Sequence, residues 1–259
     1  MKPFSEILDD VKWRIAAACA RAHREASEVE IVAVTKTHGA DVVREAYEAG
    51  LTVIGENKVQ EAAWKKSLSP AGLDWHLIGH LQGNKVRHAL QVFDVIHSVD
   101  SAKLLMRLQQ VADEMGKSPR ILLEVNVSGE KSKTGMPPAD VDEAVRTILD
   151  SCPRLTFEGF MTMAPFSEDP EDARPYFRRL RELRDETEKK FSLCLPRLSM
   201  GMSGDFEVAV EEGATWVRLG TVLFGSRPKL KRPQAEGDEA SFGGLDSYSG
   251  AGPTVRILD

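Results

Sequence analysis

The apolar positions of the chain form short runs that alternate with longer segments of helical periodicity. Each run has the length and the β-branched content of a buried strand, whereas the segments between runs repeat apolar residues at spacings of three and four. Strands that alternate with helices pair in parallel through right-handed crossovers. Eight candidate strands favour a single TIM-type (β/α)8 barrel over an open α/β sheet. The runs are Ile31–Thr35, Leu51–Gly55, Trp75–Gly79, Val92–His97, Ile121–Val127, Leu155–Met161, Leu198–Met200 and Thr215–Leu219.

The helical segments show equally regular stripes. Apolar residues at 4, 7, 8, 11, 15, 18 and 19 predict an extra N-terminal helix before the first strand. Further stripes run through residues 104–115, 141–149 and 176–191 and predict helices between the strands.

The pattern changes after Arg227. Residues 229–259 are rich in Gly, Ser and Pro and have almost no apolar periodicity. Such a segment cannot bury enough apolar surface to offset the entropy of ordering it. The sequence therefore predicts a barrel domain at 1–228 and a flexible, disordered tail at 229–259.

Composition and charge narrow the class of protein. The chain has 259 residues, of which 42% are hydrophobic and 29% charged, which is typical of a globular protein. Its net charge of −6 lacks the basic excess that nucleic-acid or membrane-surface binding requires, so neither partner is expected. The three cysteines show no short pair spacing and predict neither a disulfide framework nor a metal site. Acidic residues near the N-terminus and the lack of a membrane-length apolar stretch favour the cytoplasm.

Candidate chemistry follows the strand ends, because reactive groups in a parallel barrel lie at the carboxyl ends of the strands. Lys36 comes directly after the first run. Its amine either reaches solvent along a buried stem or lies in the barrel mouth, where loss of water makes it a nucleophile toward aldehydes. Asn57 follows the second run and either contacts an aromatic cofactor or caps the next helix.

The seventh strand end is small and polar. The stretch from Ser199 to Asp205 precedes a helical pattern that begins near Phe206. Its backbone N–H groups are suited to a phosphate, unless the side chain of Ser203 or Asp205 caps the helix instead.

The eighth strand end adds an arginine, a glycine and a hydroxyl. Gly220 and Thr221 follow this strand, and phosphate sites recur in barrels of this type at the loops after strands seven and eight. Arg218 shares a strand face with Gly220 and needs a partner. That partner is either a carboxylate or the ring nitrogen of a bound cofactor.

Taken in order, these motifs closely resemble the pyridoxal 5′-phosphate (PLP) homeostasis protein family, whose barrel is similar to the N-terminal domain of alanine racemase. The resemblance spans residues 4 to 228 and rests on residues 33–37, 54–61, 75–85, 126–135, 199–205 and 217–225. Two features depart from the pattern. His38 and Gly39 stand where many members have lysine and proline, and the tail is longer than in many members.

The resemblance implies PLP as the cofactor and assigns the residues around it. Lys36 would carry PLP as a Schiff base, Asn57 would meet the ring, and Arg218 would meet the pyridine nitrogen. The phosphate would be met by Ser199, Ser203, Gly220 and Thr221.

The expected chemistry suits a carrier better than an enzyme. PLP enzymes that use the ring as a strong electron sink protonate its nitrogen through an acidic partner. An arginine only donates a hydrogen bond to that nitrogen, which keeps the sink weak. Racemases that share this arginine add a tyrosine from a second domain, and the residues after 228 are too few to build one. We therefore expect a protein that buffers or delivers PLP for vitamin B6 and amino-acid homeostasis, without substantial catalysis.

Two alternatives stay open at this level. One is a PLP-dependent amino-acid racemase or a related enzyme. The other is a sugar-phosphate barrel enzyme in which Lys36 forms its Schiff base with the substrate. The expected partners are PLP and PLP-requiring apoenzymes, and a monomer is favoured because the sequence shows no obvious exposed apolar stripe.

Overall fold

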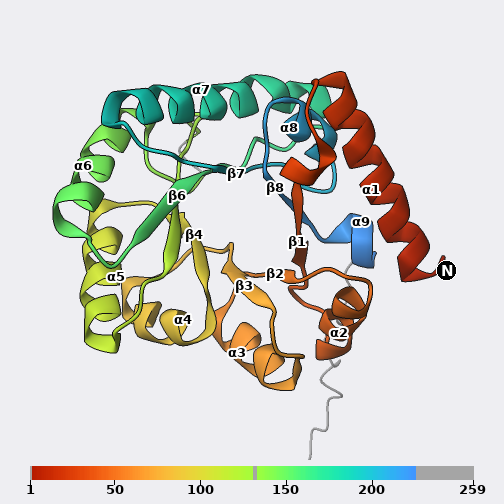
Figure 1. Ribbon diagram of the computed structural model, residues 1–259, viewed down its shortest axis with the longest axis horizontal. Helices are drawn as coiled ribbons and strands as arrows, with labels where there is room; N and C mark the ends of the chain where they lie inside the picture. Colours follow the sequence, from red (N-terminus) through yellow and green to blue (C-terminus); the bar gives the residue numbers. More distant parts are fainter. Residues whose placement is uncertain (1, 131–132, 226–259) are drawn as a thin grey trace, which may run out of the picture. The chain divides into compact units, whose positions relative to one another are not determined.

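A closed barrel of parallel strands lies at the centre of the protein, with helices around it (Figure 1). This computed structural model describes residues 2–130 and 133–225, so the predicted tail lies outside the described residues. The strands follow chain order around the barrel, and β1 pairs with β8 to close it. They are β1 (Glu30–Val34), β2 (Val53–Glu56), β3 (Asp74–Leu77), β4 (Val95–Val99), β5 (Arg120–Glu124), β6 (Thr156–Met161), β7 (Arg197–Ser199) and β8 (Trp216–Leu219). The predicted (β/α)8 barrel is confirmed.

The helices include the predicted N-terminal one. They are α1 (Phe4–Arg21), α2 (Ala40–Glu48), α3 (Val59–Leu68), α4 (Val86–Val92), α5 (Ala102–Met115), α6 (Val141–Ser151), α7 (Arg174–Phe191), α8 (Phe206–Glu211) and α9 (Thr221–Phe224). Local sequence explains their ends. In α5, the Ser101 hydroxyl accepts the Leu104 N–H at 3.4 Å, and Gly116 ends the helix at a φ of +62°. No helix in the described residues is long and apolar enough to span a membrane.

The fourth strand begins later than its apolar run predicts. Val92 is the last residue of α4, and β4 begins only at Val95. The Val92 carbonyl accepts a hydrogen bond from Lys66 Nζ at 2.5 Å, so the helix end is held by α3. An apolar run alone does not separate the last turn of a buried helix from the strand that follows it.

Alternation along each strand separates the inside of the barrel from the outside. One residue from each of six strands forms a small apolar cluster in the lumen, whereas the outward residues pack in the larger core beneath the helices. The lumen cluster consists of Val32, Val53, Val95, Leu122, Met161 and Trp216.

One glycine allows β6 and β7 to approach each other. Gly159 has a φ of +150°, and a Cβ atom there would lie 1.8 Å from the carbonyl oxygen of Arg197. Any side chain at residue 159 would therefore push the two strands apart.

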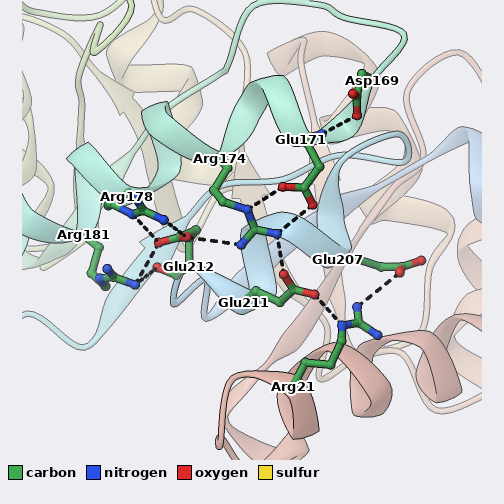
Figure 2. A network of polar contacts seen from close by, with 9 residues as sticks. All are labelled: Arg21, Asp169, Glu171, Arg174, Arg178, Arg181, Glu207, Glu211 and Glu212. Carbon is green, nitrogen blue, oxygen red and sulfur yellow. Dashed lines mark hydrogen bonds and ion pairs between the residues drawn. The ribbon is translucent and has the colours of Figure 1, made fainter.

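An ion-pair network joins α7, α8 and the N-terminal helix on the outside of the barrel (Figure 2). Glu212 lies at its centre, with Arg178 and Arg181 each 3.0 Å and Arg174 3.2 Å from its carboxylate. Arg174 also binds Glu211, which in turn accepts from Arg21 of α1 at 2.6 Å. The network therefore ties the extra helix to the barrel.

Replacing Glu212 with glutamine is expected to lower the free energy of unfolding by about 1–2 kcal/mol at neutral pH. Burial raises the pKa of Glu212, but hydrogen bonds from Arg178 and Arg174 outweigh it and hold the pKa below its ordinary 4.5. A carboxylate with a lowered pKa contributes stability above its unfolded-state pKa and loses it as the pH falls. Urea unfolding should therefore show a gap between wild type and variant that narrows below about pH 4.5.

Glu186→Gln is the matched control, because its exposed carboxylate lies 3.3 Å from Arg179 on the same helix. This control should cost well under 1 kcal/mol. Equal losses for the two variants would contradict the central role of Glu212.

Candidate functional site

Lys36 lies at the carboxyl end of β1, on the barrel mouth. Val34 and Gly55 are partners in the ladder between β1 and β2, so two further residues on each strand lead to Lys36 and Asn57. The lumen position of Val32 and the period of two predict that Lys36 continues the inward-facing row of β1. Its side chain is half-buried. The structure thus brings two of the predicted site residues to one side of the mouth.

The peptide groups on either side of Lys36 are held by two charged side chains of α3. Lys65 Nζ donates to the Thr35 carbonyl at 2.7 Å, and the Thr37 N–H donates to Glu61 Oε1, also at 2.7 Å. Thr37 has a φ of +69°, a conformation that costs a β-branched residue about 1–2 kcal/mol. These contacts hold the backbone at Lys36 in one bent conformation.

Together these contacts form a clamp on the backbone at Lys36. Lys65 lies at the centre of this clamp and is fully buried. Its amine also binds Glu56 Oε1 at 2.6 Å and Glu61 Oε1 at 2.8 Å, and Thr35 Oγ1 donates to Glu56 Oε1 at 2.7 Å. Burial raises the pKa of Glu56 despite the hydrogen bonds from Lys65 and Thr35. Burial also acts to raise the pKa of Glu61, but Lys65 and the Thr37 N–H outweigh it and lower that pKa.

Just beyond the ends of β2 and β3, the backbone of Asn57 lies against that of Gly79. A Cβ atom on Gly79 would lie 2.6 Å from the Asn57 carbonyl oxygen, so only glycine fits against this backbone. Asn57 Oδ1 is buried and has no hydrogen-bond partner among the described residues. An orphaned buried amide oxygen at a barrel mouth is suited to a ligand that supplies a donor.

Arg218 points into the lumen from β8 and is only 5% exposed. Its Nη1 donates to the carbonyl and the hydroxyl of Ser199, each at 2.7 Å, and its Nη2 donates to the Thr162 carbonyl at 2.8 Å. These bonds use three of the five guanidinium N–H groups. Within the described part of the chain, Nε–H and the second Nη2–H have no acceptor.

The carboxyl groups of Glu124 and Asp205 lie close enough to Arg218 to interact with its charge. Burial lowers the pKa of Arg218 to about 10, against the opposing effect of Asp205 and Glu124, so the guanidinium stays charged at neutral pH. Burial raises the pKa of Glu124, which accepts a hydrogen bond from Thr134 Oγ1. Burial also raises the pKa of Asp205, although the Met202 N–H and Arg218 act to lower it. The mouth is therefore a desolvated site with a fixed cation.

Ser199 lies in the lumen beside Arg218. Its hydroxyl is fully buried and lies 2.9 Å from His97 Nδ1 in addition to its contact with Arg218. The resemblance assigns Ser199 to a phosphate, but its side-chain contacts in the protein are with the arginine and a histidine.

The other predicted phosphate residues meet at the start of α9. Ser203 Oγ accepts the Val222 N–H at 3.2 Å, which leaves the hydroxyl proton of Ser203 to donate elsewhere. A Cβ atom on Gly220 would lie 3.2 Å from the Val34 carbonyl, which places Gly220 against the end of β1. Thr221 is exposed beside it. The Asp205 side chain accepts the Met202 N–H at 2.6 Å, so one amide of the preceding loop is already bound.

Sequence reasoning missed the buried polar residues behind the mouth. The spacing of Glu61 and Lys65, one helical turn apart, indicates an ion pair but not its contact with Thr35. His76 and His97 each interrupt an apolar strand run, which is the signal that would have identified them as buried polar residues.

These residues fit PLP by their own chemistry. A half-buried lysine, an arginine with unused N–H groups and an orphaned asparagine oxygen surround a mouth that is narrowed by glycines. The guanidinium is suited to an acceptor nitrogen on a planar ring, and the hydroxyls of Ser203 and Thr221 are suited to phosphate oxygens.

Fold and site together define a barrel of the alanine racemase N-terminal class, and the model of that family, alanine racemase N-terminal domain, matches residues 8–228. A pyridoxal phosphate homeostasis protein of Aquifex aeolicus is 46% identical over 223 residues, which cover 86% of this chain and 97% of the relative. The chain therefore belongs to the pyridoxal phosphate homeostasis protein family. The predicted resemblance is confirmed.

Solved structures agree with this membership. PipY of Synechococcus elongatus, solved with PLP bound, has a TM-score of 0.73 at 41% identity and matches 82% of this chain and 100% of its own. An alanine racemase of Clostridium difficile has a TM-score of 0.66 at 14% identity, over 87% of this chain and 57% of its own. The second likeness shows the fold alone.

Proposed function

We propose that this protein binds PLP at the barrel mouth, with Lys36 as the Schiff-base lysine, and buffers or delivers the cofactor. The observation that carries the proposal is the buried Arg218, fixed by Ser199 and Thr162 with N–H groups left over. The names of the relatives and the PLP bound to PipY support it.

Different residues of this chain would bind different parts of the cofactor. Arg218 would donate to the pyridine nitrogen, Asn57 would contact the ring, and Ser203, Gly220 and Thr221 would bind the phosphate. Ser199 was assigned to the phosphate by resemblance, and its contacts support a role beside Arg218 instead. The bound cofactor supplies an aldehyde for the lysine and a conjugated ring that withdraws electrons.

The site supports a carrier over an enzyme, because an arginine that stays charged does not protonate the ring nitrogen. The racemase alternative requires a side chain that moves a proton on the face opposite the lysine. Glu124 is the described carboxyl in the mouth whose strand, β5, lies across the barrel from β1. Alanine turnover therefore tests the two functions directly.

We further propose that the recipients are PLP-requiring apoenzymes and that the protein acts as a monomer in the cytoplasm. The acidic net charge of −6 supports partners other than nucleic acid and membrane surfaces.

The test incubates the PLP-loaded protein with L-alanine and measures D-alanine over several hours. We expect a rate no greater than that of free PLP at the same concentration, while the absorbance band of the bound cofactor persists. Steady turnover that disappears in Lys36→Ala would replace the carrier with a racemase. The sugar-phosphate enzyme would be favoured if the protein gained no absorbance band with PLP, while borohydride reduced an imine with a sugar phosphate and so left the sugar phosphate attached to the protein.

A further inference from the structure

A chain of hydrogen-bonding side chains runs down the barrel lumen from Arg218 to His76, which faces Asp74 at the opposite end. Arg218 Nη1 lies 2.7 Å from Ser199 Oγ, which lies 2.9 Å from His97 Nδ1. His97 Nε2 lies 2.9 Å from His76 Nδ1, and His76 Nε2 lies 3.2 Å from Asp74 Oδ2. Arg218, Ser199 and both histidines are buried, and Asp74 also binds Arg120 at the far end. This lumen chain connects the candidate cofactor site to the amino-terminal face of the barrel.

At one end of the lumen chain, the ionised carboxylate of Asp74 influences which ring nitrogen of His76 carries the proton. Burial acts to raise the pKa of Asp74, but His76 and Arg120 outweigh it and lower the pKa to about 2. His76 Nε2 faces this carboxylate at ion-pair distance, outside hydrogen-bond geometry, and the negative charge favours a proton on that nitrogen.

The guanidinium sets the direction at the other end. Arg218 donates to Ser199 Oγ, and the buried hydroxyl proton of Ser199 then requires an acceptor of its own. Among the described residues, His97 Nδ1 is the acceptor within reach. His97 then holds its proton on Nε2 and donates it to His76 Nδ1. The three hydrogen bonds from Arg218 to His76 are satisfied when both imidazoles are neutral and protonated on Nε2, and the Nε2–H of His76 then faces Asp74 at ion-pair distance.

The reverse arrangement is less favourable. A doubly protonated His76 would donate to His97, and His97 would donate to Ser199 Oγ. That arrangement leaves the Ser199 hydroxyl proton without an acceptor and buries a second cation near Arg218. Burial lowers the pKa of His97 well below its ordinary value, and the charges of Arg218 and Arg120 add to the effect.

An indole ring keeps both imidazoles in place. The Trp216 ring is stacked on His97 at 5.1 Å and meets His76 edge-on at 4.7 Å. Its Nε1 donates to Glu30 Oε2 at 2.8 Å, which fixes the indole as well. Both histidines thus have a defined ring orientation as well as a defined proton position.

We propose that Ser199, His97 and His76 are positioning residues that hold the guanidinium of Arg218 in a single orientation. With Nη1 bound by Ser199 and Nη2 by Thr162, the Arg218 guanidinium turns its Nε edge toward the ligand. The inference rests on the proposed function for its ligand, because it assumes that Arg218 meets the cofactor nitrogen. The proton positions on His76 and His97 are expected to be the same with and without PLP.

The first test reads the proton positions directly. Nitrogen-15 NMR of the histidine rings at pH 7, with and without PLP, should show His76 and His97 as neutral Nε2–H tautomers. The signals are assigned by loss in His76→Gln and His97→Gln. An imidazolium or an Nδ1–H tautomer at either residue would overturn the inference, whatever the protein binds.

The second test breaks one link and restores it. Ser199→Ala should change the His97 ring shifts, weaken PLP binding about tenfold and shift the absorbance band of the bound cofactor at saturation. Ser199→Thr keeps the hydroxyl and should return the ring shifts, with affinity within about threefold of wild type. Ser98→Ala, which removes a hydroxyl that bonds the Gly79 carbonyl from the next residue of β4, should leave the ring shifts unchanged.

The outcomes separate the two claims. Wild-type protein that shows no PLP band contradicts the proposed function and leaves the tautomer result to decide the lumen chain. Wild-type affinity and an unchanged band in Ser199→Ala overturn the positioning role. Equal losses in the alanine and threonine variants also overturn it, because the hydroxyl would then not be the group that matters.

Discussion

Lys36→Ala is expected to abolish the covalent attachment of PLP. The wild-type protein should be yellow with PLP, and borohydride should fix the cofactor on one peptide. Without the amine no Schiff base can form, so the reducible adduct should fall to background. Absorbance spectra before and after borohydride, followed by peptide mass spectrometry, measure the change.

The matched controls are lysines near other strand ends. Lys58 begins the turn after β2 and Lys133 lies in the loop after β5, and the structure describes both residues. Lys58→Ala and Lys133→Ala should retain the adduct on Lys36. An adduct found mainly on either of these lysines in the wild type would contradict the assignment.

Lys65→Met is expected to produce the largest loss of stability. The substitution removes the amine that binds the Thr35 carbonyl, Glu56 and Glu61, and it leaves the Glu56 carboxylate buried with Thr35 alone. Breaking a buried ion pair from one side costs about 3–5 kcal/mol. For a domain of this size, thermal unfolding should shift down by roughly 6–20 °C.

Lys66→Met is the control on the same helix, because this lysine is half-exposed and loses only a hydrogen bond to the Val92 carbonyl and an ion pair 3.7 Å from Asp94. It should cost at most about 1 kcal/mol. If Lys65→Met unfolds within a degree of Lys66→Met, the clamp does not stabilise the fold. In the folded fraction of Lys65→Met, PLP should attach more slowly, because the Thr35 carbonyl beside Lys36 loses the donor that holds it.

The sequence predicted the barrel because strand and helix periodicities are local properties. The stripe through 104–115 became α5 because its apolar residues face the core and Ser101 and Gly116 mark its ends. The start of β4 was misplaced because Val92 is apolar whether it ends a helix or begins a strand. Strand boundaries depend on pairing partners that the local sequence does not contain.

The functional site shows the same difference between local features, which the sequence reveals, and contacts between distant residues, which it does not. Strand ends in a barrel meet at one mouth, so the location of Lys36 and Arg218 at the mouth could be predicted, whereas the choice between their possible roles needed the family resemblance. The partners of Arg218 were not found, because Thr162 acts through its backbone carbonyl, which carries no residue-specific signal. His76 and His97 interact across neighbouring strands, and only three-dimensional register brings their rings together.

Trp216 gives the barrel an optical reporter of its own. Trp13 and Trp64 are exposed to solvent, Trp75 packs in the outer core, and Trp216 alone among these four indoles lies in the lumen. It is two residues before Arg218 on the same strand face, roughly 7 Å away along β8. Its ultraviolet emission overlaps the absorption of a conjugated pyridine ring, so a cofactor seated at Arg218 quenches it by energy transfer. Occupancy of the mouth is thereby readable from intrinsic fluorescence, without a label.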